Sequence, residues 1–176
     1  MLSRMHVLFV CTGNICRSAT AERLAVAYAE ELGIDDLTVE SAGTHAVAGQ
    51  EMEPTAAKVL EGLGGDPDGF TARMLTPEIA SAADLVLTMS EQHREAVLSV
   101  APSQFPKTFT LKEAVRLTDA VGATTVAQLA EARRDHRNTG DPEDVSDPIG
   151  KDEETYLTIG SEIAELLGTL TRAVRG

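Results

Sequence analysis

Aromatic side chains are scarce in this sequence, whose 176 residues include four Phe, two Tyr and no Trp. A binding pocket built from it has little aromatic surface on which to stack a ring. Long apolar runs are also missing, and none approaches the ~20 residues that a membrane-spanning helix requires. Residues 1–10 lack the apolar region of roughly 7–15 residues that marks a secretory signal, so we expect a cytoplasmic protein without a membrane span.

Cysteine and positive charge are the next shortages. The two cysteines, Cys11 and Cys16, are too few for a disulfide framework, and the four histidines show no metal-ligand spacing, so neither a metal nor a cofactor is expected. The 15 Lys and Arg face 28 Asp and Glu, which gives a formal net charge of −13. Because nucleic-acid phosphates are held by clustered cations, this balance argues against a nucleic-acid partner. The same charge predicts a slow approach of strongly acidic partners.

The length suits a single domain spanning residues 1–176. Apolar periodicity predicts strands at residues 7–10, 37–41, 84–89 and 107–111, and helices at 17–31, 54–63, 91–100, 124–136 and 153–174. This alternation predicts an α/β fold of three layers, with a mostly parallel sheet covered on both faces and a site at the carboxyl ends of its strands. The polar stretch 117–145 is open to interpretation as a lid, an interaction surface or a plain surface insertion.

Residues 7–18, Val-Leu-Phe-Val-Cys-Thr-Gly-Asn-Ile-Cys-Arg-Ser, carry the strongest functional signal. An apolar strand runs straight into Cys11, and a helix is predicted to begin at Arg17. The intervening loop wraps the helix N-terminus, where unpaired N–H groups and the helix dipole favour a phosphate-like dianion. We expect Gly13 and Asn14 to adopt positive φ, so that successive N–H groups converge on one point.

A cysteine at such a place is a candidate nucleophile. Free thiols titrate near about 8.5, and helix N-termini or nearby cations lower that to roughly 3.5–7.5. The Arg17 guanidinium can bind two phosphate oxygens, and Ser18 is placed to donate a hydrogen bond to the thiolate, which predicts attack of Cys11 on phosphorus. The alternative is that Cys11 is a small buried apolar residue. Cys16 either packs only, or closes a reversible disulfide that protects Cys11 from over-oxidation.

Displacing an alcohol or phenol from phosphorus also requires a proton donor, for which a carboxylic acid is suited. Asp-Pro pairs begin at Asp66, Asp141 and Asp147. Proline biases the residue before it toward extended backbone, so such a pair can aim a carboxyl group. Asp147 is favoured because its turn directly precedes the last predicted helix, with Asp141 and Asp144 as the alternatives.

Several segments together resemble one known family. They are residues 7–18, Ala21-Glu22, Ser41-Ala42-Gly43-Thr44, Ala72-Arg73, residues 83–89 and Asp147-Pro148-Ile149-Gly150. In this order they are similar to the low molecular weight protein tyrosine phosphatase family. The resemblance implies a four-stranded parallel sheet with flanking helices and no metal, and it makes residues 117–145 a family-variable insertion.

The resemblance also implies a two-step mechanism. Cys11 attacks phosphorus while Arg17 stabilises the equatorial oxygens and Asp147 protonates the leaving oxygen; Asp147 then activates the water that hydrolyses the phosphocysteine. The loop residues expected to bind the substrate phosphate are Thr12, Gly13, Asn14, Ile15, Cys16 and Ser18. In the family, the residues matching Asn14, Ser18 and Ser41 hold the loop and stabilise the thiolate.

Departures from the family pattern bear on the substrate. The places where family members commonly carry aromatic walls hold His45, Ala46, Val47, Ile149 and Gly150, and Phe70 replaces a histidine of the loop network. The expected partners are phosphorylated proteins, with inorganic phosphate or a similar oxyanion able to occupy the loop.

Ile15 favours phosphotyrosine, because the arginine-phosphatase relative carries threonine there, although residues 109–113 look similar to that branch. A protein-arginine phosphatase is therefore the second reading. Arsenate reduction with a small thiol remains a third, and a phosphate-binding module without turnover is the reading outside enzymes.

Overall fold

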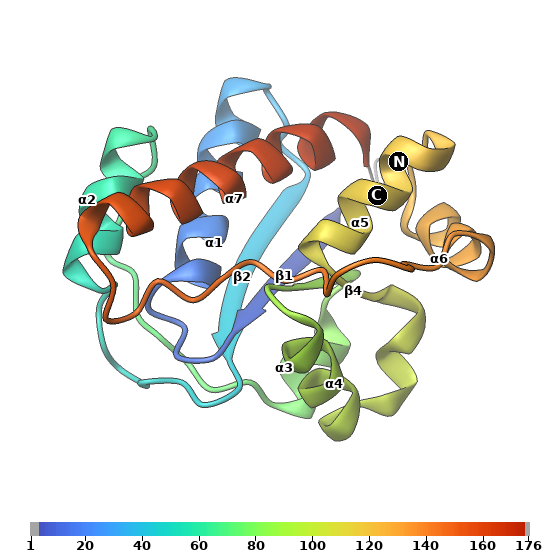
Figure 1. Cartoon of the computed structure of the whole chain (residues 1–176), viewed down its shortest axis with the longest axis horizontal. Coiled ribbons are helices and arrows are strands. Elements are labelled where there is room, and N and C mark those ends of the chain that lie inside the picture. The colour runs from blue at the N-terminus through green and yellow to red at the C-terminus, as the bar shows by residue number, and fades with distance from the viewer. Residues whose placement is uncertain (1–3, 175–176) are drawn as a thin grey trace.

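The structure is a computed structural model that describes residues 4–174. The strands β1 (Met5–Cys11), β2 (Leu37–Gly43), β3 (Leu85–Thr88) and β4 (Thr108–Thr110) form one four-stranded parallel sheet in the order β2-β1-β3-β4 (Figure 1). Its helices are α1 (Arg17–Glu31), α2 (Pro54–Gly62), α3 (Pro77–Ala82), α4 (Glu91–Val100), α5 (Leu111–Val121), α6 (Val126–Asp135) and α7 (Glu153–Ala173), with a 3₁₀ helix η1 (Pro102–Lys107). The predicted fold class is confirmed.

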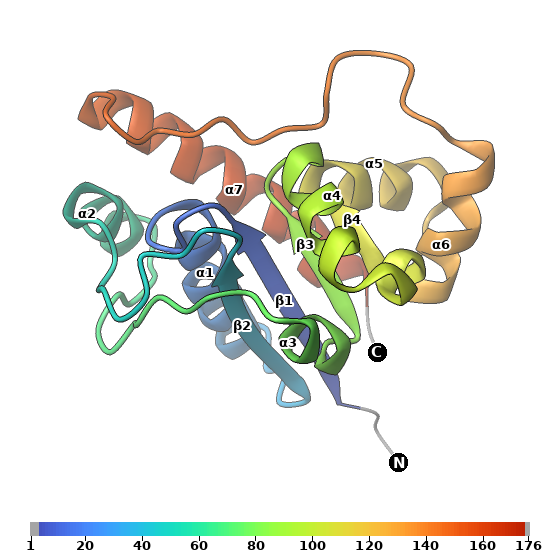
Figure 2. The same ribbon diagram turned by 90° about the horizontal axis from the view of Figure 1, so that it is seen from below.

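Alternation along β1 assigns its side chains to the two faces of the sheet. Phe9 packs on one face in a core that includes residues of α1, α2, α5 and α7, whereas Leu8 and Val10 pack on the other face with residues of α3 and α4. Figure 2 shows these two helix layers on opposite sides of the strands. The apolar character of both faces explains why residues 7–10 read as a continuous apolar run.

The connections of the sheet reverse direction beside β1. The chain leaves β1 toward β2 on one side, and then returns to β3 on the other side of β1. Such a switch between neighbouring parallel strands leaves a crevice outside their carboxyl ends. The segments that follow β1 and β3 therefore meet at the place where the sequence predicts chemistry.

Helix α1 differs from the other long helices at its N-terminus. The side chains of Ser90, Thr110 and Asp152 cap α4, α5 and α7 by accepting backbone N–H bonds. The N-cap of α1, Cys16, makes no side-chain cap. The first N–H groups of α1 are thus left to the loop in front of it.

Two helices and a part of the core were not expected from the sequence. The sequence pattern predicts a strand that ends at residue 111 and a polar stretch from 117, but α5 runs from Leu111 to Val121 and α3 lies ahead of β3. Leu117, Leu129 and Val145 belong to the main core, so part of residues 117–145 packs against it. That this stretch varies within the family stays a prediction.

No helix within residues 4–174 is long and apolar enough to span a bilayer. The cytoplasmic location and the extent of the domain also stay predictions.

Candidate active site

The loop between β1 and α1 turns on Asn14, the one non-glycine residue of the described chain with positive φ, at 57°. Gly13 does not share this conformation, so that part of the prediction is wrong. A Cβ on Gly13 would lie 3.6 Å from both Ile15 and Val47, which is ordinary contact. The reversal of the loop is thus made at Asn14, which tolerates the left-handed region better than most residues.

Cys11 lies buried at the end of β1, and its Sγ is 2.9 Å from Ser18 Oγ. Asn14 Nδ2 donates a 2.8 Å hydrogen bond to the same Ser18 oxygen. Because that bond occupies a lone pair of Ser18, the hydroxyl hydrogen is free to point at sulfur. The arrangement suits a thiolate, since a negatively charged sulfur can only accept.

Asn14 also ties the loop to the neighbouring strand β2. Its Nδ2 donates to Ser41 Oγ at 2.9 Å, and Ser41 in turn donates to Glu22 Oε1 at 2.8 Å. Its Oδ1 accepts the backbone N–H of Arg73 at 2.9 Å. Burial raises the pKa of Glu22, the acceptor at the end of this chain of bonds. All three polar hydrogen-bonding groups of the Asn14 side chain are thereby satisfied.

Glu22 and Arg73 lie in segments that resemble the family, although the sequence assigns them no role. Arg73 Nε donates to the carbonyl of Ser41 at 2.9 Å, and the Arg73 backbone bonds Asn14, so this residue supports the loop network. Phe70, which stands where a histidine is common, is buried instead, with the guanidinium of Arg23 5.6 Å from its ring centroid. The spacing of Ser18 and Glu22, one helical turn apart, is the signal that could have placed Glu22 at the loop.

Arg17 brings the distant C-terminal segment to the loop. Its Nη1 donates to the carbonyl of Val145 at 2.9 Å, and its Nη2 lies 3.6 Å from Asp147 Oδ2. The Arg17 side chain is buried, whereas the Asp147 side chain is 51% exposed. Ile149 N–H donates to Asp147 Oδ1 at 3.0 Å and so helps to orient the carboxylate.

The alternative carboxylates are engaged elsewhere. Asp144 Oδ1 accepts the N–H of Glu91 at 2.8 Å, at the start of α4. Asp66 accepts the N–H of Asp68 within its own turn, and Asp141 is exposed. Of the Asp-Pro pairs, the structure therefore brings Asp147 beside Arg17.

His93, on α4, contacts the loop without having been singled out by the sequence. Its Nε2 is 2.8 Å from Thr12 Oγ1, and the residue is 5% exposed. Burial, with a smaller contribution from Arg17, lowers the pKa of His93 to about 4, so the ring is neutral near pH 7. The signal that could have placed His93 at the loop is that it follows β3 in the sequence, because β3 neighbours β1 in the sheet.

Cys16 is also buried, and both cysteines are free thiols. Burial raises the pKa of Cys16 to about 12, and the neighbouring Cys11 contributes in the same direction. Cys16 therefore stays protonated over the physiological range. A disulfide between the two stays a prediction.

The rim of the loop is aliphatic. Val47 N–H donates to the carbonyl of Gly13 at 3.0 Å, and the Val47 side chain is exposed beside the loop. The exposed Ile149 follows the Asp147-Pro148 turn. Val47 and Ile149 therefore present exposed aliphatic side chains near the loop.

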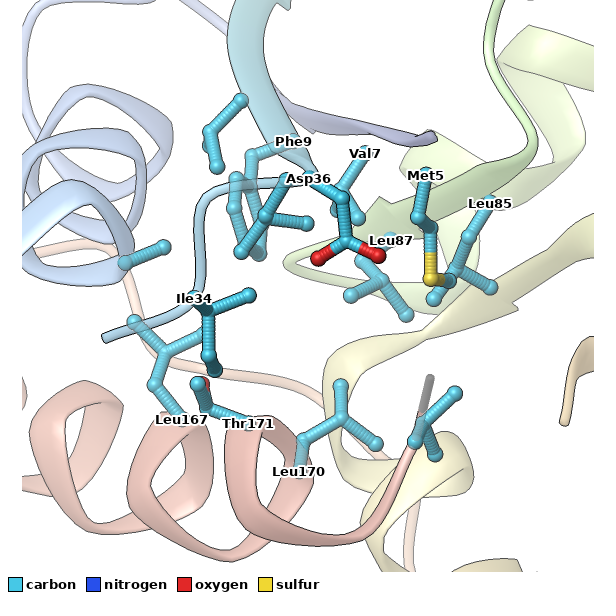
Figure 3. A pocket seen from close by; sticks show the side chains of 14 residues that line it. Met5, Val7, Phe9, Ile34, Asp36, Leu85, Leu87, Leu167, Leu170 and Thr171 are labelled. Atoms are coloured by element: carbon cyan, nitrogen blue, oxygen red, sulfur yellow. The ribbon is translucent and has the colours of Figure 1, made fainter. Parts of the chain in front are cut away.

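A cavity lies at the other end of the sheet (Figure 3). It encloses about 50 Å³ between the amino ends of the strands and the end of α7, and its lining is apolar apart from Asp36 and Thr171. Met5 lines it at the end of β1 opposite Cys11, so this cavity takes no part in the candidate site. Among residues 4–174, no cluster of three or more His, Cys, Asp or Glu could hold a metal ion.

Comparison with known proteins assigns the chain to a family. The model of the family described as low molecular weight phosphotyrosine protein phosphatase matches residues 6–121. The chain is 33% identical over 171 residues to the protein-arginine-phosphatase of Bacillus subtilis (strain 168), with 97% of each protein covered. The chain belongs to the low molecular weight phosphotyrosine protein phosphatase family.

Solved structures agree with this assignment. A low molecular weight protein tyrosine phosphatase from T. tengcongensis is 33% identical with a TM-score of 0.77, over 96% of this chain and 98% of that chain. The YwlE arginine phosphatase, in a mutant with a phosphorylated active-site serine, is also 33% identical with a TM-score of 0.77, over 96% of this chain and 94% of that chain.

Proposed function

We propose that this protein hydrolyses phosphotyrosine-type phosphomonoesters on proteins through a phosphocysteine intermediate. The observation that carries the proposal is the convergence of Cys11 with the uncapped N-terminus of α1, beside an arginine that also holds Asp147 within 3.6 Å. The site thus combines a nucleophile and anion-binding groups from the loop after β1 with an acid from the segment before α7. The phosphorylated serine in the active site of the YwlE mutant supports this assignment, because it shows a side chain of a relative carrying the phosphoryl group.

In the first step, the Cys11 sulfur forms a bond to phosphorus while the bond from phosphorus to the leaving oxygen breaks. Backbone N–H groups of residues 12–18 and the Arg17 guanidinium stabilise the equatorial oxygens. Protonated Asp147 gives its proton to the leaving oxygen. The bond from Ser18 stabilises the attacking sulfur as a thiolate.

In the second step, water attacks the phosphorus of phosphocysteine. Asp147, now a carboxylate, takes a proton from that water, and the sulfur–phosphorus bond breaks. Inorganic phosphate and the Cys11 thiolate are the products. Exposure of the Asp147 side chain allows water to reach this position.

Two observations bear on the group attached to the phosphate. Ile15 is apolar where the arginine-phosphatase branch carries a hydroxyl, which favours phosphotyrosine. The second candidate, a protein-arginine phosphatase, is favoured by the 33% identity with the B. subtilis enzyme over nearly the whole chain. The aliphatic rim of Val47 and Ile149 is compatible with either side chain.

Phosphate release from para-nitrophenyl phosphate tests the mechanism. We expect steady turnover in the parent and none in Cys11→Ser. The rate of Asp147→Asn should be lower by roughly 10²–10⁴-fold, which is the usual effect of losing a general acid. Equal turnover in Cys11→Ser and the parent would overturn the nucleophile. No turnover in the parent, with phosphate still bound, would make this a binding module.

Substrate choice is tested with peptides that differ only in phosphotyrosine, phosphoarginine or phosphoserine. A higher kcat/KM for phosphotyrosine supports the main proposal, and a higher value for phosphoarginine selects the second candidate. Reduction of arsenate with a small thiol is measured in parallel, since the same loop could serve that reaction.

A further inference from the structure

The general acid lies on a segment with no regular secondary structure. Between the C-cap of α6 at His136 and the N-cap of α7 at Asp152, the chain crosses the molecule as a long loop (Figure 2). Loops of this length are usually functional, and their shape must be held by contacts with rigid elements. Asp147 is half exposed, so its own surroundings do little to fix the backbone that carries it.

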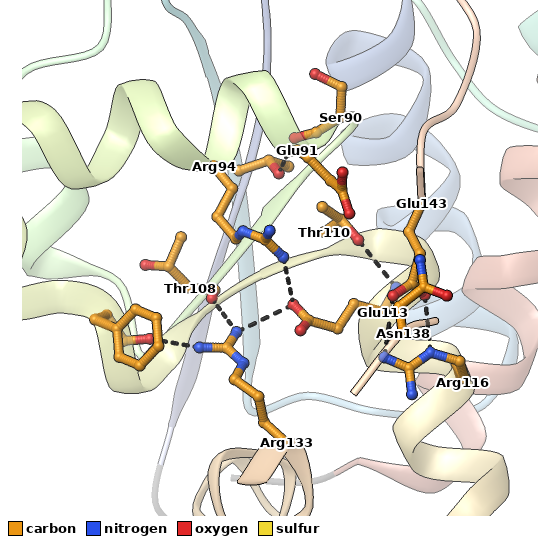
Figure 4. A network of polar contacts seen from close by, with 12 residues as sticks. Ser90, Glu91, Arg94, Thr108, Thr110, Glu113, Arg116, Arg133, Asn138 and Glu143 are labelled. Carbon is orange, nitrogen blue, oxygen red and sulfur yellow. Dashed lines mark hydrogen bonds and ion pairs between the residues drawn. The ribbon is translucent and has the colours of Figure 1, made fainter. Parts of the chain in front are cut away.

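Arg116 of α5 holds both the start and the middle of this loop, and Figure 4 shows its contact with Glu143. Its Nε and Nη2 donate to the two carboxylate oxygens of Glu143 at 3.0 Å each, in a two-point fork. Its Nη1 donates to the carbonyl of His136 at 2.6 Å. The Glu143 side chain is 10% exposed and the Arg116 side chain 32%, so water competes weakly for the carboxylate of this pair.

The residues after Glu143 connect this fork to the reacting groups. Asp144 accepts the N–H of Glu91, and Val145 donates to the carbonyl of Met89 at 2.7 Å. The Val145 carbonyl accepts from Arg17, and Asp147 follows two residues later. A displacement of Glu143 therefore occurs four residues from Asp147, on a segment whose next contacts are with Arg17 and α4.

We propose that Arg116 and Glu143 are positioning residues that aim Asp147 at the leaving oxygen. This inference rests on the proposed role of Asp147 as the general acid. The pair touches neither phosphate nor the nucleophile, so its loss should misplace the acid and leave the phosphate-binding loop intact. Neither residue was singled out by the sequence, and the helix that carries Arg116 was not expected there.

Leaving-group dependence separates this role from plain stability. A misplaced acid slows substrates whose leaving group needs a proton, such as phenyl phosphate, and spares 2,4-dinitrophenyl phosphate, whose phenol departs as an anion. For Glu143→Gln we expect kcat/KM to fall about tenfold with phenyl phosphate and less than about twofold with 2,4-dinitrophenyl phosphate. The tenfold loss is smaller than the loss expected when the acid itself is removed, because a misplaced acid still donates some of the time. Competitive inhibition by inorganic phosphate should stay within about twofold.

Matched variants complete the experiment. Glu131→Gln and Arg134→Lys change the same residue types at exposed positions of α6 and should leave the ratio of the two substrates unchanged. Arg116→Lys keeps the charge but loses the fork, and should change the ratio as Glu143→Gln does. Arg116→Lys also loses the bond to His136, so the double variant should be no worse than Arg116→Lys alone.

Partial unfolding lowers kcat/KM for both substrates by the same factor. The ratio of the two kcat/KM values is therefore unaffected by loss of folded protein. An unchanged ratio in Glu143→Gln, or additive effects in the double variant, would overturn the positioning role. Asp147→Asn is measured alongside. If it too leaves the ratio unchanged, the proposed acid is wrong; if it alone changes the ratio, only the positioning inference fails.

Discussion

Asn14 combines a left-handed backbone with hydrogen bonds from every polar group of its side chain. Its φ is 57°, and it bonds Ser18, Ser41 and the backbone of Arg73. For Asn14→Ala we expect a loss of about 3 kcal/mol in the free energy of unfolding, from unpaired buried groups and from a β-carbon in the left-handed region. Chemical denaturation in urea measures it.

Asn14→Gly is the control that separates the two causes. It loses the same hydrogen bonds but adopts positive φ freely, so it should be more stable than Asn14→Ala by about 1 kcal/mol. Equal stabilities would mean that the backbone conformation of the loop contributes nothing.

His93 makes the loop sensitive to acid. The pKa of about 4 in the folded protein lies below the ordinary value of 6.5, so the unfolded chain binds the proton first as pH falls. The effect of His93 on stability is therefore absent above about pH 6.5. As pH falls from there to about 4, His93 destabilises the folded state progressively. The full shift corresponds to at most about 3 kcal/mol.

Comparison with His93→Gln isolates this effect, because the glutamine amide can still bond Thr12 but does not titrate. The free energy of unfolding of the parent minus that of the variant should decrease as the pH is lowered from 6.5 to about 4, and it should not change with pH above 7. A difference that does not change with pH would refute the buried neutral histidine.

At the scale of elements, α7 packs against α2 through Gly160. A β-carbon there would lie 2.8 Å from Val59 Cγ1 and 3.2 Å from Leu63 Cδ1. Gly160→Ala should therefore lower the free energy of unfolding by about 1–2 kcal/mol, since overpacking outweighs the gain in helix propensity. Thermal and urea unfolding both measure it.

Gly168 offers the matched control on the same helix. A β-carbon there meets only the end of the Arg172 side chain, at 3.6 Å. Gly168→Ala should stabilise the protein by about 0.5–1 kcal/mol through helix propensity alone. Stabilisation by both alanines would show that α2 and α7 can move apart without cost.

The elements also show which sequence signals suffice. Residues 7–31 were predicted well, because an apolar run and a helical pattern are local signals that tertiary contacts reinforce. Helix α5 was missed although Thr110 and Glu113 stand at capping-box spacing, and Thr110 Oγ1 accepts the N–H of Glu113 at 3.0 Å. The sequence therefore contained that signal.

Other parts of the site carry no local signal. His93 meets Thr12 across 81 positions of sequence, and Arg17 bonds Val145 across 128. Both contacts depend on how α4 and the loop before α7 dock on the sheet, which no motif specifies. Asp147 was found because an acid directly before proline is a visible pattern, whereas Glu143 comes after a proline and carries no such signal.

At the scale of the whole molecule, the parallel sheet and the charge act together. The crevice beside β1 gathers Arg17 and open N–H groups at one edge, within a chain of net charge −13. A phosphate at this edge meets a local positive field, while an acidic protein approaching from a distance meets a negative one. The local positive field acts over a shorter range than the negative field of the whole molecule, so a change in salt concentration should distinguish their effects.

We expect kcat/KM for a phosphopeptide with acidic flanks to rise several-fold between 0.01 and 0.15 M salt, where the screening length falls from about 30 to about 8 Å. The same phosphorylated core with basic flanks should show the opposite trend. A peptide with neutral flanks reports the effect of salt on the phosphate site itself, and both charged peptides are compared with it. If all three peptides respond alike, the field of the loop alone governs encounter, and the acidic surface of the molecule does not select its substrates.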